Sequence, residues 1–169
     1  LNNPYLTAAT CSVETELSTP FWQGIIVRGG FGQQTANNGL NNTFHCGIVR
    51  SYNNSVIERA LVGISANTTF EETTPGLLSI SQTNFINNGN GVLMSAFLTP
   101  TTTASSFQDC IFVDNHHLTP NTNGIASFFT HSVLISRCRF TGFTQSGILG
   151  VNSGIEIEGG TIFDDNNFG

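Results

Sequence analysis

The chain carries little charge and has no lysine. Only 9% of its 169 residues are charged, against about a quarter in an average soluble domain, and all five basic residues are arginines. Binding to nucleic-acid phosphates needs clustered basic side chains, and five scattered arginines in an acidic chain cannot supply them. No apolar run approaches the roughly 20 residues of a bilayer span. We therefore expect neither a nucleic-acid partner nor membrane insertion.

Helical patterns and metal-binding spacings are also scarce. Glycine and β-branched residues interrupt every candidate helical window. The four cysteines show no C-x-x-C spacing, so a structural zinc is not expected, nor is any other cofactor. In their place, the chain is rich in Thr, Ser and Asn and contains 18 glycines. That composition is typical of short strands joined by turns and predicts an all-β chain.

A phenylalanine recurs with a period in the twenties. It stands at positions 85, 112, 140 and 163, and each occurrence follows a run of alternating apolar residues. Such a period, with strands in every repeat, is the signature of a solenoid. We predict two interior rows, an aromatic ladder (Phe85, Phe112, Phe140 and Phe163) and a row of small residues two positions earlier (Thr83, Cys110, Cys138 and Thr161).

Three repeats read F-x-x-N, at 85–88, 112–115 and 163–166, and resemble coils of the right-handed parallel β-helix of the pectate-lyase-like superfamily. The segment at 22–27, Trp-Gln-Gly-Ile-Ile-Val, is similar to the strand that opens β-helix domains in secreted and cell-surface proteins of Bacteroidetes. The resemblance implies a right-handed parallel β-helix over residues 22–169, an irregular N-terminal cap over 1–21, and a secreted or cell-surface location. At about 25 residues a coil, we expect about six to seven coils.

The asparagine that ends each F-x-x-N element is expected to be structural. Asn88, Asn115 and Asn166 stand where the chain must turn between strands. An asparagine there can bond to the backbone of a neighbouring coil, and it tolerates a left-handed conformation.

The cysteines fall into two pairs. Cys110 and Cys138 occupy the same site on adjacent coils and point inward, so we favour buried, unbridged thiols over a disulfide between them. Cys11 and Cys46 flank the strand at 22–27 and are the better placed pair for a disulfide, which would staple the N-terminal cap.

Asp109, Arg137 and Arg139 are the candidate catalytic residues. Asp109 and Arg137 are expected to face outward on neighbouring coils within ion-pair reach. The resemblance implies that lyases of this fold use a basic residue as the base, and often acidic residues that hold calcium, on one exposed strand face. Because the chain has no lysine and no tight carboxylate cluster, we favour a surface ion pair over a catalytic centre.

A metal or proton-transfer site is the other candidate. Asp114 and His116 follow one ladder turn together with His117, and Asp164 occupies the corresponding turn two coils on, beside Asp165. The intervening turn offers no ligand, so we favour exposed turn residues over a metal centre.

The preferred function is a non-enzymatic, extracellular structural or adhesive module of a secreted, surface-attached or filament-forming protein. Its expected partners are further copies, or further coils of a longer chain. The alternative is a β-helix that binds or degrades polysaccharide, for which a surface polysaccharide would be the partner. Ile111 and Ile162 precede ladder phenylalanines, and their parity predicts exposed apolar side chains on one face, unless a loop or partner covers them.

Overall fold

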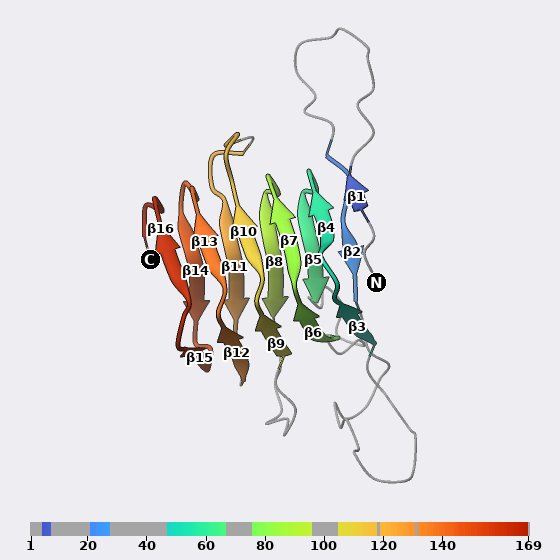
Figure 1. Ribbon diagram of the computed structural model, residues 1–169, viewed down its shortest axis with the longest axis vertical. Helices are drawn as coiled ribbons and strands as arrows, with labels where there is room; N and C mark the ends of the chain where they lie inside the picture. The colour runs from blue at the N-terminus through green and yellow to red at the C-terminus, as the bar shows by residue number, and fades with distance from the viewer. Residues whose placement is uncertain are drawn as a thin grey trace, which may run out of the picture.

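The computed structural model is a stack of parallel strands wound into a β-helix (Figure 1). It describes residues 5–7, 21–27, 47–66, 76–95, 105–117, 119–130 and 132–168, and within these ranges there are sixteen strands and no helix. All strand pairs are parallel, and the strands form three sheets. The predicted all-β parallel β-helix is confirmed.

Each sheet takes one strand from every coil. Sheet 1 contains β2 (Ile25–Ile26), β5 (Val62–Ala66), β8 (Asn90–Ser95), β11 (Asn123–Phe128) and β14 (Ser146–Val151). Sheet 2 contains β3 (Ile48–Ser51), β6 (Leu77–Ser81), β9 (Ser105–Gln108), β12 (Val133–Ser136) and β15 (Ile155–Glu158). Sheet 3 contains β1 (Tyr5–Thr7), β4 (Ser55–Glu58), β7 (Thr83–Ile86), β10 (Ile111–Val113), β13 (Arg139–Thr141) and β16 (Ile162–Asp164). Because neighbours in a sheet are three strands apart in sequence, the chain passes through sheets 1, 2 and 3 once per coil. The first coil is therefore β2–β4, and the second to fifth coils are β5–β7, β8–β10, β11–β13 and β14–β16.

The described chain completes about five coils, fewer than the six to seven expected. The assumed length of about 25 residues per coil was too short. Successive coils place Ile25, Ile64, Val92, Ile125 and Ile148 at equivalent positions of sheet 1, and long connections between strands lengthen the first three of these intervals. β1 lies in the range predicted to form the cap and pairs with β4 of sheet 3. Residues 8–20 of that range lie outside the described residues.

The aromatic ladder is present in the interior of sheet 3. Ring centroids of Phe85 and Phe112 are 4.6 Å apart, those of Phe112 and Phe140 4.7 Å, and those of Phe140 and Phe163 5.2 Å, with interplanar angles of 3°, 8° and 9°. The centroid spacing follows the distance between adjacent strands, so each ring stacks on the next. Ile57 occupies the same position one coil earlier and is fully buried. Because Ile57 is not aromatic, the phenylalanine repeat did not predict that it belongs to this column.

A column of glycines in sheet 1 faces the aromatic ladder. A Cβ at Gly124 would lie 2.5 Å from Cδ1 of Phe140 and 2.5 Å from the carbonyl oxygen of Gly147. Gly91 and Gly147 are similarly close to Phe112 and Phe163, respectively. The phenyl rings therefore fill the space that a side chain in this glycine column would need. A phenylalanine in the ladder thus requires a glycine opposite it in sheet 1.

The predicted row of small residues caps the sharp bend between sheets 2 and 3. Thr83 Oγ1 donates to the carbonyl oxygen of Ser81 at 2.9 Å, and Cys110 Sγ contacts the equivalent carbonyl of Gln108 at 3.3 Å. The residue between donor and acceptor is left-handed in the second, third and fourth coils (Gln82, Asp109 and Arg137). In the fifth coil Thr161 Oγ1 donates one residue further back, to Glu158 O, and Gly160 is left-handed. A thiol thus takes the place of a hydroxyl as the donor of this bend.

The outer face of sheet 3 carries the predicted exposed apolar residues. Ile111 is 43% and Ile162 53% exposed, and Arg139 lies between them in register. The residues of sheet 3 that were predicted to face inward and those predicted to face outward therefore do so.

Candidate functional site

Asp109 and Arg137 form a two-contact ion pair between adjacent coils. Arg137 Nε donates to Asp109 Oδ1 at 2.7 Å and Nη2 to Oδ2 at 2.9 Å. Both residues occupy the left-handed position of their bends, with φ of 53° and 50°, which directs the two side chains outward together. The guanidinium lowers the pKa of the Asp109 carboxyl, and the carboxylate raises the pKa of Arg137. The predicted ion pair is confirmed.

The third catalytic candidate belongs to a separate pair. Arg139 lies on the outer face of β13, where its Nη2 donates to Asp164 Oδ2 at 2.8 Å and its Nε donates to Thr141 Oγ1 at 3.2 Å. Asp164, proposed as a metal ligand, is therefore engaged with a cation. The structure brings each of these two arginines to a carboxylate of a neighbouring coil, and Asp109 and Asp164 lie in separate ion pairs.

Asp114 is buried rather than exposed at its turn. Its side chain is 1% exposed and accepts hydrogen bonds from Thr122 Oγ1 at 2.6 Å and from the His117 backbone N–H at 2.9 Å. His117 Nδ1 lies 3.3 Å from Asp114 Oδ2. These contacts hold His117 and Thr122 against the buried carboxylate, so the interpretation of Asp114 as an exposed turn residue was wrong.

The three metal candidates do not form a centre. His116 is exposed, Asp114 is enclosed by its turn, and Asp164 is paired with Arg139. In the part of the chain that the structure describes, no three His, Cys, Asp or Glu side chains are placed to hold one metal ion.

Two of the three turn asparagines make the same lateral bridge. Asn88 Nδ2 donates to Ile57 O at 3.0 Å, while its Oδ1 accepts from Ala60 N–H at 2.8 Å. Asn166 makes the matching bonds to Phe140 O and Phe143 N–H at 3.0 and 3.1 Å. Both side chains thereby satisfy backbone groups of the preceding coil.

Asn115 departs from that pattern. Its side chain is exposed, and its backbone N–H donates to Oδ1 of Asn87 at 2.9 Å. The turn of this coil is longer, so the chain leaves the common path at Asn115. The left-handed residue of the regular turns is also one position before the predicted asparagine, at Asn87 (φ 52°) and Asp165 (φ 53°).

Cys110 and Cys138 are free thiols in the structure, each about 1% exposed. The contact with Cys138, followed by burial, raises the pKa of the Cys110 thiol. Each Sγ also donates to the carbonyl oxygen two residues earlier, Cys110 to Gln108 and Cys138 to Ser136, so this pair serves packing and the bend. Cys11 and Cys46 lie outside the described residues.

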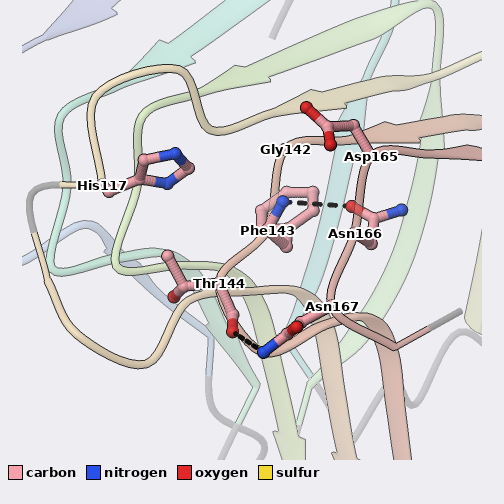
Figure 2. A pocket seen from close by; sticks show the side chains of 7 residues that line it. All are labelled: His117, Gly142, Phe143, Thr144, Asp165, Asn166 and Asn167. Atoms are coloured by element: carbon pink, nitrogen blue, oxygen red, sulfur yellow. Dashed lines mark hydrogen bonds between the residues drawn. The ribbon is translucent and has the colours of Figure 1, made fainter.

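A hollow of about 360 Å³ opens at the turn between sheets 3 and 1, across the last three coils (Figure 2). His117 comes from the third coil, Gly142, Phe143 and Thr144 from the fourth, and Asp165, Asn166 and Asn167 from the fifth. Figure 2 shows His117 and Asp165 on opposite sides of Phe143. The two turns singled out from the sequence therefore meet here, but through His117 and Asp165 rather than His116 and Asp164.

Gly142 is the reason that the hollow exists. It takes the left-handed position of its turn with φ 79°, where the turns of the second and fifth coils have Asn87 and Asp165. A Cβ there would lie 2.5 Å from the carbonyl oxygen of Asp114. The fourth coil thus projects no side chain at this position between its two neighbours.

No protein-family model, curated protein or solved structure matches this chain. In the described ranges, no helix is long and apolar enough to cross a bilayer.

Proposed function

We propose that this chain is a non-enzymatic structural or adhesive β-helix module of a secreted, surface-attached or filament-forming protein. The observation that carries the proposal is the pairing of charged side chains across coils, Asp109 with Arg137 and Arg139 with Asp164. A carboxylate and a guanidinium that hold each other in this way join neighbouring coils, and neither is left free as an acid or a base.

The fifth coil supports further coils, or further copies, as partners. β14, β15 and β16 are the outermost strands of their sheets. Ile157 is 49% exposed, whereas Ile135, its register partner one coil earlier, is fully buried. Exposed apolar side chains along unpaired strand edges are a template for another strand. A further parallel coil, from this protein or from a second copy, would cover them.

An extracellular location agrees with a surface that owes its polarity to Thr, Ser and Asn. The resemblance at 22–27 to secreted β-helix proteins points the same way.

A polysaccharide-binding or polysaccharide-degrading role is the second candidate. The hollow beside His117 and Asp165 favours it, because a concave site with convergent polar groups is the usual form of a small-ligand site.

A polysaccharide panel separates the two candidates. Purified protein is incubated with acidic and neutral polysaccharides, and new reducing ends and retardation in affinity electrophoresis are measured. The structural role predicts neither cleavage nor retention. Cleavage or retention that is lost in Asp165→Ala, at the hollow, and kept in Glu156→Ala, an exposed acidic control on β15, would overturn it.

Sedimentation velocity tests the partner. If a second copy covers the fifth coil, association of the chain falls in Ile157→Asp, because a carboxylate would then be buried between apolar side chains. A wild-type chain that is monomeric at high concentration would contradict the second-copy partner.

A further inference from the structure

The hollow at the last three coils offers a ligand mainly hydrogen-bond acceptors. Its backbone donors are used within the protein: Gly142 N–H donates to Asp164 O, and Asn167 N–H to Phe143 O. The Phe143 N–H is bonded to Asn166 Oδ1. The backbone at the floor of the hollow therefore offers a ligand few donors.

The side chains around the floor also use their hydrogen-bond donors within the protein. Thr144 Oγ1 donates to Pro120 O at 3.1 Å, and Asn167 Nδ2 donates to Thr144 O at 3.1 Å. Asn166 Nδ2 donates to Phe140 O at 3.0 Å. The hydroxyl proton and one hydrogen of each amide are thus directed at backbone carbonyls rather than into the hollow.

Lone pairs remain at the rim. Within the described residues, the carboxylate of Asp165 and Oδ1 of Asn167 have no hydrogen-bond partner. His117 Nδ1 faces the carboxylate of Asp114 at 3.3 Å, so this ring nitrogen is engaged within the protein. Two acceptor groups of the fifth coil, on Asp165 and Asn167, therefore face one space.

Two carboxylates place negative charge at the hollow. Asp165 is exposed at the rim, and the buried carboxylate of Asp114 lies behind His117. No arginine lines the hollow, and the chain contains no lysine. Negative charge with free acceptors matches a ligand that carries positive charge and several donors.

We propose that this hollow binds a primary ammonium group on a small molecule. An ammonium is a compact charge with three donors and no acceptor, which suits the carboxylate of Asp165 and Oδ1 of Asn167. A volume of about 360 Å³ is at the small end of the range for ligand sites. A divalent metal needs about four or more ligands, which this lining does not present. Amino sugars and linear polyamines both supply the ammonium.

The test is a chemical-shift titration of isotope-labelled protein with glucosamine, glucose and the linear amine cadaverine. We expect glucosamine to shift the amide signals of Gly142 and Asn167, while glucose, which lacks the amino group, leaves them unchanged. A response to glucosamine but not cadaverine assigns the amino sugar, and the reverse assigns the polyamine.

The chain offers a matched pair of variants. Asp165→Asn should weaken ammonium binding about tenfold or more, because a charge-assisted hydrogen bond is lost. Asp164→Asn changes the adjacent carboxylate, which is bound to Arg139 outside the hollow, and should leave the affinity unchanged.

Four results would overturn the proposal: no shift at high ligand concentration, equal shifts with glucose, equal weakening by both aspartate variants, or a response to zinc alone. The inference is independent of the structural role proposed above, and its failure would leave that role in place.

Discussion

Phe112 is one of the two members of the aromatic ladder with a stacked ring on each side, and Phe112→Ala tests the ladder directly. The side chain is fully buried, lies 4.6 and 4.7 Å from the rings of Phe85 and Phe140, and meets Phe107 edge-on at 6.2 Å. Truncation of a buried phenylalanine costs about 3–5 kcal/mol. Two stacked contacts and an edge contact place this position at about 5 kcal/mol, the upper end of that range.

Phe163→Ala is the matched control, because the same residue type occupies the same column at its last rung. Phe163 is half-buried and stacks on a single ring at 5.2 Å. Its removal should cost about 2 kcal/mol, in proportion to the smaller area that it buries.

The assay is urea unfolding of both variants, followed by far-ultraviolet circular dichroism and by hydrogen exchange of the amides in the neighbouring coils. Each coil contacts only its neighbours, so we expect the faster exchange in Phe112→Ala to centre on β7, β10 and β13. Equal destabilisation by the two variants, or a cost below about 2 kcal/mol for Phe112→Ala, would refute the view that the stacked interior holds the coils together.

Three further perturbations examine the glycine column, the lateral turn bonds and the ion pair at the bend. Gly124→Ala should lower the free energy of unfolding by about 1–3 kcal/mol, since its Cβ would meet Phe140. Gly159→Ala, with nothing within 4 Å, should stay within about 0.5 kcal/mol of the wild type in the same thermal melt. Asn88→Ala removes the partner of the buried Ala60 N–H and one hydrogen bond to Ile57 O, and should cost about 1–3 kcal/mol. Asn115→Ala, at an exposed side chain, should be near neutral, and equal losses at the two asparagines would contradict the lateral bridge. The folded-state pKa of Asp109 is lowered, so its ion pair stabilises the protein above the unfolded-state pKa of about 3.9, and that contribution is lost as the pH falls through the lower folded-state value. Acid unfolding of wild type and Asp109→Asn should therefore differ above about pH 4 and converge below it, and a difference that persists in acid would contradict the pairing.

The features that were predicted correctly depend on strand parity and on the repeat. Phe85, Phe112, Phe140 and Phe163 stack because residues at the same position of successive coils are neighbours in a parallel sheet. The ion pair between Asp109 and Arg137 follows from the same rule.

Features at the turns could not be predicted in this way. Asn115 matches the F-x-x-N pattern, but the longer turn after it takes its side chain away from the neighbouring coil. The coil number was overestimated because insertions have no effect on ladder parity and so leave the repeat recognisable. For the hollow, the sequence indicated the two turns that supply it but selected His116 and Asp164 over His117 and Asp165. The direction of a turn side chain depends on backbone conformation, not on alternation.

The sequence by itself determined which residues form columns. The repeat gives the residues that occupy the same position in successive coils, and the alternation along each strand gives the face on which they lie. Only the tertiary structure decided the partners of the polar side chains at the end of sheet 3. Asp164 turns to Arg139, while the adjacent Asp165 lines the hollow opposite His117. That division rests on the positive φ of Asp165 and Gly142 and on contacts among three successive coils, which exist only once the coils are stacked.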